Sequence, residues 1–381
     1  MSTFFLVMAT LIVAGVVAGS FKHDSRSMQP ALRVSGPRPR PQARSARSWQ
    51  ERSFAKALVL SPATGAPLLR PLSLKEDRSG DLLALDWSDA GVRRFTAAGQ
   101  PRAAYHLPAG VRGGNPEDFD VDSGGNVWIC YHDAGTVVEL EPGGRPQQTW
   151  HLANSPHRIL APGAGRLVVF AADAGSNLFY RYSEQGEMLG GFGRLLEGDA
   201  QDPLTLDGDV ARDGTGGFVY AALHTGLLAS YTLDGALRFL VQTIDRVKLP
   251  TIVTATGASR KVAAGSPFAA LTVSVAGDEI YVLVDAPAFQ GSPSRALDVY
   301  SNRDGSYLYS FHAPEQTSFA LVAGDHMYTI QDAVITRWRM QPAAAPMPPP
   351  GPRQALLDRS QAQPDRGKIE PDRGLRTELR R

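Results

Sequence analysis

Histidines and acidic residues recur at fixed places beside short apolar runs of the sequence. Five of the eight histidines close such runs: His106, His132, His151, His224 and His312. Other polar residues directly precede such runs: Asn115, Glu117, Asp118, Asn154, His157, Asp207 and Asp209. Near neutral pH a histidine can move protons or bind a ligand, and a carboxylate can assist it. The alternative is that the histidines are packed or solvent-facing, and that Asp and Asn only form turns.

No short motif of the sequence carries a complete catalytic set. A nucleophile elbow, an HExxH motif, a Walker loop and a CxxC motif are all missing from the 381 residues. The single cysteine, Cys130, excludes an intrachain disulfide and any zinc site built from several cysteines. Its apolar run, Val127-Trp-Ile-Cys130, favours a packed thiol over a nucleophile. A functional site must therefore be assembled by the fold.

The elements that position these residues repeat along the chain. Six glycines each stand one residue before an apolar, β-rich run: Gly80, Gly125, Gly165, Gly216, Gly277 and Gly324. Most runs lead through a turn containing Asp or Gly into a second run, and five copies add a further glycine turn and a third run. A strand-like segment also precedes the glycine, as in residues 119–122, 158–161, 208–211, 271–275 and 319–322. Four short strands per copy, at intervals of 40 to 61 residues, predict a β-propeller.

The last copy is incomplete, and this predicts how the ring closes. After Trp338-Arg-Met340 no outer run follows. The segment Phe54–Leu60 is strand-like and has no hairpin partner nearby. Because open strand edges invite aggregation, we expect residues 54–60 to supply the missing strand. The predicted fold class is thus all-β, a six-bladed β-propeller closed by an N-terminal strand that completes the last blade. The alternative is a sandwich of six unrelated hairpins.

Composition divides the chain into four predicted segments. Residues 53–340 form the propeller, and their net charge is −8, which argues against nucleic-acid binding. Residues 20–52 are rich in Arg, Pro and Ser and predict a disordered basic linker. Residues 341–381 predict a second disordered tail, which is Pro-rich and charged. Residues 1–19 contain the apolar stretch 4–19, a signal peptide or an N-terminal membrane anchor. We therefore expect a periplasmic or secreted monomer, tethered to the membrane if residues 4–19 are retained.

Two stretches resemble a known repeat family. Residues 170–182, with Phe170-Ala-Ala-Asp173 and Asn177-Leu-Phe-Tyr-Arg-Tyr182, resemble an NHL repeat. Residues 116–128 are similar to NHL repeats and to gluconolactonase-like and streptogramin-lyase-like propellers. The resemblance covers about residues 80–340 and implies a six-bladed propeller. Resemblance to the gluconolactonase-like enzymes also implies an axial divalent cation of the calcium type, with Asn154, Asp207 and Asp209 as its candidate ligands.

Two functions remain open at this point. The first is a binding scaffold without a cofactor, whose loop face engages a protein, peptide or glycan through His132, His224, Asn115 and Asp118. The second is a metal-dependent lactone or ester hydrolase, or a lyase. In that case Asp207 or Asp209 holds the cation and His157 moves the proton. The absence of a complete catalytic motif favours the scaffold.

Overall fold

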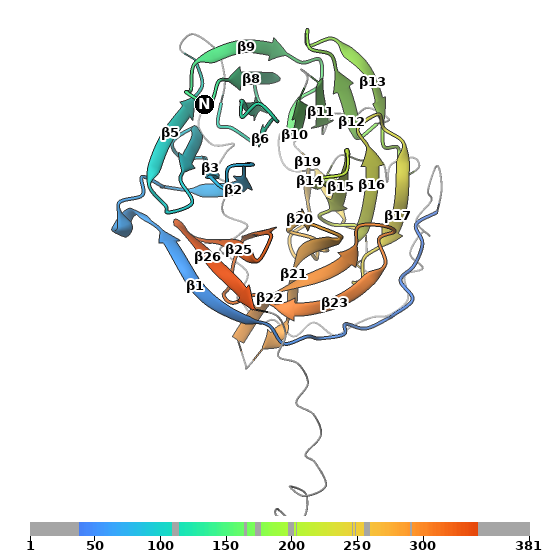
Figure 1. The fold of residues 1–381 in the computed structure, drawn as a ribbon. Helices are drawn as coiled ribbons and strands as arrows, with labels where there is room; N and C mark the ends of the chain where they lie inside the picture. Colours follow the sequence, from blue (N-terminus) through green and yellow to red (C-terminus); the bar gives the residue numbers. More distant parts are fainter. Residues whose placement is uncertain are drawn as a thin grey trace, which may run out of the picture. The chain divides into compact units, whose positions relative to one another are not determined.

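The computed structural model describes residues 38–108, 114–163, 166–171, 177–196, 202, 204–245, 247, 249–254, 260–289 and 292–341. Six four-stranded antiparallel sheets form a ring of blades around a central axis, as Figure 1 shows, and inner-strand residues line a cavity at its centre, which we call the channel. The predicted all-β, six-bladed propeller is confirmed. The predicted segment 1–19, residues 20–37 of the predicted linker 20–52, and residues 342–381 of the predicted tail 341–381 lie outside the described residues.

Each blade consists of four strands, and in blades 1 to 5 the strand numbers increase from the channel outward. Blade 1 contains β2 (Pro71–Glu76), β3 (Leu82–Asp86), β4 (Gly91–Phe95) and β5 (Pro101–His106). Blade 2 contains β6 (Asp118–Val121), β7 (Val127–Tyr131), β8 (Thr136–Leu140) and β9 (Pro146–His151). Blade 3 contains β10 (Pro156–Gly163), β11 (Arg166–Ala171), β12 (Phe179–Tyr182) and β13 (Met188–Phe192).

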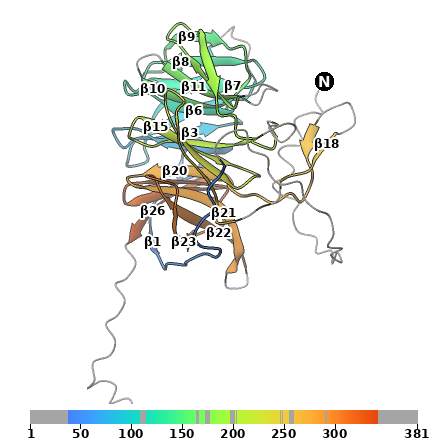
Figure 2. The same cartoon turned by 90° about the vertical axis from the view of Figure 1, so that its right-hand side faces the viewer.

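Blades 4 and 5 continue this order. Blade 4 contains β14 (Gly208–Arg212), β15 (Gly217–Ala222), β16 (Leu227–Thr232) and β17 (Leu237–Gln242). Blade 5 contains β20 (Thr272–Ala276), β21 (Glu279–Phe289), β22 (Ser292–Ser301) and β23 (Tyr307–His312). Between them the chain forms a hairpin of β18 (Ile252–Thr254) and β19 (Arg260–Val262). Figure 2, which shows the ring from its side, places β18 outside the layer of blades.

Blade 6 joins the two ends of the propeller. It contains β24 (Phe319–Ala323), β25 (His326–Gln331) and β26 (Val334–Gln341), and its outer strand is β1 (Ser53–Leu60). The antiparallel register runs from Ser53 opposite Gln341 to Leu60 opposite Ile335. The predicted closure by residues 54–60 is therefore confirmed. A 3-10 turn, η1 (Pro62–Thr64), follows β1 and leads the chain toward blade 1.

The turns follow from local chemistry. In blade 2 the Asp122 carboxylate accepts hydrogen bonds from the backbone NH groups of Gly124 and Asn126, at 2.7 and 2.9 Å. This is the Asp turn that the repeat predicts. Between β8 and β9, Gly144 has a φ of 86°, which a residue without a Cβ adopts at no steric penalty.

The hydrophobic core lies between blades rather than inside them. Each cluster of buried side chains among the described residues joins two neighbouring blades, and six such clusters follow one another around the ring. The cluster between blades 3 and 4 contains Phe170, Phe179, Phe218 and Tyr220. Cys130 is fully buried between blades 2 and 3, and burial raises the pKa of its thiol. The prediction of a packed thiol is thus confirmed.

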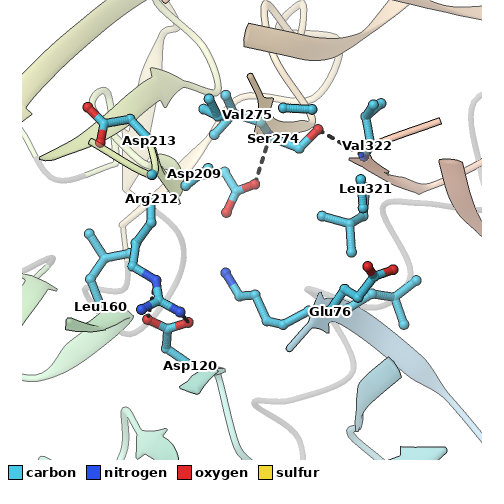
Figure 3. Close-up of a pocket in the computed structure, with 18 of the residues that line it drawn as sticks. Glu76, Asp120, Leu160, Asp209, Arg212, Asp213, Ser274, Val275, Leu321 and Val322 are labelled. Atoms are coloured by element: carbon cyan, nitrogen blue, oxygen red, sulfur yellow. Dashed lines mark hydrogen bonds and ion pairs between the residues drawn. The ribbon is translucent and has the colours of Figure 1, made fainter. Parts of the chain in front are cut away.

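Polar side chains of the inner strands also link neighbouring blades. Asp118 and Asp120 of β6 accept hydrogen bonds from the backbone NH groups of Ile159 and Ala161 in β10, at 3.1 and 2.9 Å. Ser274 of β20 accepts one from Val322 of β24, at 3.1 Å (Figure 3). Because side chains alternate between the two faces of a strand, Asp118 and Asp120 lie on the same face of β6, the face toward blade 3.

Residues 38–52 differ from the predicted linker. They run along the outer strands of blades 4 and 5, as the blue segment outside β17 and β23 in Figure 1. Arg40 pairs with Val241 of β17, and Trp49 with Ser310 of β23. We call residues 38–52 the strap. Arg40, Gln42 and Arg47 of the strap hydrogen-bond to blades 4 and 5. A composition typical of disorder therefore does not prevent this segment from packing on the ring.

Candidate functional site

The candidate site lies where the channel opens at the loop face. The loop face is the face of the ring at which the innermost strand of each blade begins and the second strand of each blade ends. Glu117 precedes β6, and His157 is the second residue of β10. The Glu117 Oε1 and His157 Nδ1 atoms are 3.8 Å apart, and the rings of His157 and His132 lie 4.0 Å apart. Neighbouring blades thus bring a carboxylate and two imidazoles together at the mouth.

Arg158 lies at the centre of this mouth. Its guanidinium is 3.8 Å from the Glu117 carboxylate and 3.6 Å from that of Asp209. Burial alone would lower the pKa of Arg158, but the charges of Asp207 and Asp118 come next in size and help to raise it. Arg158 therefore stays charged and compensates only part of the negative charge around it.

Glu117 keeps its charge at this position. Burial alone would raise its pKa. The contact with His157 and the charge of Arg158 outweigh burial, so the pKa lies below its usual value. About a third of the Glu117 side chain and a fifth of the His157 side chain remain exposed. An ionised carboxylate and an imidazole are thus within reach of a ligand.

Asp118, directly below the mouth, behaves differently. Only 3% of the residue is exposed, and burial raises the pKa of its carboxyl to about 6, against an ordinary value of 3.8. The unfolded chain releases this proton near pH 4 and the folded chain near pH 6. Folded Asp118 therefore binds more protons in this range, and its contribution to the free energy of unfolding falls as pH rises from about 4 to about 6.

We expect Asp118→Asn to be more stable than the wild type above pH 6. The amide still offers an oxygen to the Ile159 NH group but carries no buried charge. The expected gain in the free energy of unfolding is about 2–3 kcal/mol at pH 8, and it vanishes toward pH 4. Urea unfolding from pH 4 to pH 8 measures it, with Asp325→Asn on the exposed surface as the control. A variant that is less stable than the wild type at pH 8 would contradict the assignment.

The remaining predicted residues lie apart from this mouth. His224 is 5% exposed; its Nδ1 atom is 3.2 Å from the Pro267 carbonyl oxygen, and its ring stacks on Phe268. A packing role accounts for this geometry. The Asn154 side chain points to the Met188 sulfur, 4.0 Å away. Asn115 stands two residues before Glu117 and is half-buried.

The histidines at the ends of outer strands do not converge on the channel. His106 lies 3.9 Å from the Asp89 carboxylate, and His151 lies 3.2 Å from the Thr136 hydroxyl. His312 stacks flat on Trp49 of the strap, with 4.2 Å between ring centroids. Each of the three thus contacts its own blade or the strap.

The implied calcium ligands do not fit a cation. Asp209 accepts a hydrogen bond from the Val273 NH group, at 2.9 Å, and faces Arg158. Asp207 accepts one from the Gly208 NH group, at 2.8 Å, and its charge also acts on Arg158. The Arg158 guanidinium thus already supplies the positive charge that a bound cation would bring to Asp207 and Asp209. Within the described part of the chain, no three His, Cys, Asp or Glu side chains are placed to hold a metal ion.

Arg158 and Lys75 were missed from the sequence as site residues. Both lie on inner strands beside a fully buried aliphatic residue, Lys75 after Leu74 and Arg158 before Ile159. A basic residue on the channel side of an inner strand is the signal that could have found them, since long side chains are rarely buried without a counter-charge.

Comparisons with known proteins address only the fold. No family model and no curated protein matches the sequence. A solved structure of a DUF4221 family member from Bacteroides vulgatus is similar, with a TM-score of 0.53 at 8% identity, over 77% of this chain and 99% of that one.

Two further solved structures overlap much of the chain. A streptogramin B lyase has a TM-score of 0.47 at 12% identity, over 82% of this chain and 96% of that one. BamB from Moraxella catarrhalis has a TM-score of 0.43 at 11% identity, over 75% and 100%. At sequence identities this low, structural similarity supports conclusions about the fold alone. The blade order and the likeness to the Bacteroides structure agree that this chain is a six-bladed β-propeller.

Proposed function

We propose that this protein is a binding propeller whose loop-face mouth receives a cationic group of a protein or peptide partner. One observation carries the proposal. Four carboxylates act on the Arg158 guanidinium: Glu117, Asp118, Asp207 and Asp209. Lys75 is the only second cation among the described residues whose charge acts on Asp118, so negative charge still exceeds positive charge at the mouth. The mouth therefore holds an excess of negative charge, which a Lys or Arg side chain of a partner would complement.

The rest of the molecule supports a basic partner. The folded body, residues 38–340 with the strap included, carries a net charge of −4, so its long-range field attracts basic segments. The His132 and His157 rings, tilted by 48° against each other, add an aromatic surface beside Glu117, on which the stem of a Lys or Arg side chain can pack. Charge thus steers the partner, while the rings and Glu117 orient it.

Charge neutralisation at the mouth tests this function. We expect a fluorescent oligolysine peptide to bind the full chain at low salt, with fluorescence anisotropy as the readout, and oligoglutamate to bind at least tenfold more weakly. The double variant Glu117→Gln, Asp207→Asn should lower oligolysine affinity about fivefold or more, at roughly 0.5–1 kcal/mol per partly exposed charge.

The matched control is Asp325→Asn, which removes an exposed carboxylate far from the mouth, on the turn between β24 and β25. Its affinity should stay within about twofold of the wild type. If the double variant bound oligolysine as tightly as the wild type does, the mouth would not be the binding site. If oligoglutamate bound the wild type as tightly as oligolysine does, negative charge at the mouth would not determine the choice of partner.

We further propose that the propeller acts outside the cytoplasm, as residues 4–19 suggest. Among the described residues, no helix is long and apolar enough to cross a membrane. Fractionation of cells and N-terminal sequencing of the mature protein test this proposal. A cytoplasmic protein that keeps residues 4–19 would contradict it.

A further inference from the structure

The strap binds the outer edges of two neighbouring blades through its backbone. On blade 5, the Ser310 NH group of β23 donates to the Ser48 carbonyl oxygen at 2.9 Å, and the Gln50 NH group donates to the Ser310 carbonyl oxygen at 2.8 Å. On blade 4, the Arg40 backbone donates one hydrogen bond to β17 and accepts another from it, each at 3.0 Å. The strap thus adds a short parallel bridge to each of the two edges.

The carbonyl oxygen of one outer-strand position accepts from the strap on both blades, and β13 of blade 3 has the same position. β13, β17 and β23 each have a bulge at their second residue, and their register beyond it is the same. In this register, Gly191 of β13 corresponds to Leu240 of β17 and to Ser310 of β23. Leu240 and Ser310, beneath the strap, are 6% and 0% exposed, whereas Gly191 is exposed. Since the Phe192 carbonyl oxygen accepts from the Leu178 NH group within blade 3, the backbone groups of Gly191 point to the outer side.

Strand composition separates the edges that the strap covers from those that the described residues leave bare. The bare strands β5 and β9 begin with Pro101 and Pro146. The outer strand of blade 6, β1, carries Lys56 at an exposed position. Proline and lysine are residue types by which natural sheets keep an edge from pairing. The covered strands β17 and β23 contain neither, and aliphatic or aromatic residues fill four of the six positions in each.

β13 has the composition of a covered strand, yet the described residues leave it bare. Its sequence is Met188-Leu-Gly-Gly-Phe192, without proline or a charged residue, and it pairs with β12 alone. Met188 and Leu189 are 52% and 56% exposed. In Figure 1, β13 is the next outer strand beyond β17 in the direction in which the strap runs from blade 5 to blade 4. An apolar edge of this kind attracts a further strand.

The sequence that precedes the strap contains a segment of suitable composition at a suitable distance. The bridges at Trp49 and Arg40 are nine residues apart and lie on neighbouring blades. Nine residues before Arg40 stands Ala31, which begins the run Ala31-Leu-Arg-Val34. Gly36-Pro-Arg-Pro39 separates this run from Arg40, and its prolines favour an extended chain. A third step of equal length along the ring therefore brings residues 31–34 to the edge of blade 3.

We propose that residues 31–34 pair with β13 and so extend the strap to a third blade. The pairing gives the backbone groups of Gly191 partners and places apolar side chains beside Met188 and Leu189. Only five residues separate Val34 from Arg40, so the effective concentration of this segment at the edge is about millimolar. The chain's own segment therefore outcompetes that of a second copy in dilute solution. This inference does not depend on the proposed function.

A cross-link tests whether the segment reaches β13. Cys130 is fully buried, so engineered cysteines are the ones that react. In the full chain, a bismaleimide that spans about 10 Å, or three residues of extended chain, should join Leu32→Cys to Leu189→Cys within one chain. The matched control joins Leu32→Cys to Gln147→Cys, at the bulge of β9 in blade 2, and its yield should be at least tenfold lower. Equal yields overturn the proposal, and a product of two joined chains overturns it in favour of a second copy.

Hydrogen exchange, followed by NMR on the full chain, tests the pairing itself. The protection factor of the Gly191 amide should exceed that of Thr149, its equivalent in β9, at least tenfold. Leu32→Asp with Val34→Asp should abolish this difference, whereas Ser25→Asp with Ser27→Asp adds the same charge outside the segment and should preserve it. The Ser310 amide, which the strap covers, should stay protected in both double variants. The proposal is overturned if Gly191 and Thr149 are equally protected in the wild type, or if the first double variant leaves Gly191 protected.

Discussion

Deletion of residues 1–60 should abolish cooperative unfolding of the propeller or lower its melting temperature by at least about 15 °C. The deletion removes β1, which pairs with β26 along its length and buries Leu60 between blades 6 and 1. Without β1, β26 becomes an open edge, and Trp338 loses the Lys56 ammonium that lies 5.0 Å from its ring. The ring would then end in an incomplete blade.

Truncation at the other end provides the control. Deletion of residues 343–381 leaves β26 whole, since this strand ends at Gln341, and should shift the melting temperature by less than about 2 °C. A synthetic peptide of residues 38–60, added to the chain that lacks residues 1–60, should restore part of the lost stability. The closure argument would be contradicted if the chain without residues 1–60 melted within a few degrees of the melting temperature of the full chain.

The closure could be predicted because its signals are local. The apolar content of residues 54–60 indicates a strand, and the missing run after Met340 indicates where a strand is needed. The blades could be predicted for the same reason, since each glycine turn and its apolar run lie within one copy of the repeat. Fold prediction succeeded where a short stretch contains both the strand and its turn.

The strap could not be predicted, because its partners are far away in the sequence. Arg47 is separated from Asp298 by about 250 residues, and its neighbours Arg44 and Ser45 are exposed. An Arg-rich, Pro-rich segment is typical of disorder unless specific counter-charges fix it. Only the ring brings Asp298 of blade 5 and Asp245, which follows β17, to one place beside the strap.

The candidate site was predictable only in part, for a related reason. His132, His157 and Asp118 were selected because their positions at strand ends suggested the channel mouth, and the structure brings them close together. His224 has a similar place at a strand end but is covered by the segment around Phe268. Strand-end position predicts the face of the ring, whereas insertions between blades decide which side chains stay accessible.

Arg47→Ala should lower the free energy of unfolding by about 3–5 kcal/mol at pH 8. Arg47 donates to both carboxylate oxygens of Asp298, at 2.8 and 2.9 Å, and also pairs with Asp245. Asp298 is fully buried, and the Ser310 hydroxyl donates to it at 2.6 Å. Removal of the guanidinium would leave this carboxylate buried without a cation, and urea unfolding measures the loss.

The loss of unfolding free energy in Arg47→Ala should be larger at high pH than at low pH. Burial raises the pKa of Asp298, and the contact with Arg47 lowers it in part. Without Arg47 the folded-state pKa rises further, so the folded variant takes up a proton more readily than the unfolded chain does. Its stability relative to the wild type should therefore recover as pH falls through that pKa, and decline as pH rises.

Two further variants separate the buried charge from the strap as a whole. Arg44→Ala, at an exposed position three residues earlier, should change the free energy of unfolding by less than about 0.5 kcal/mol. The double variant Arg47→Ala, Asp298→Asn should recover most of the stability at pH 8 and lose the pH dependence, because no buried charge remains. A double variant as unstable as Arg47→Ala alone would show that the strap contributes through packing, with Trp49 on His312, rather than through neutralisation of Asp298.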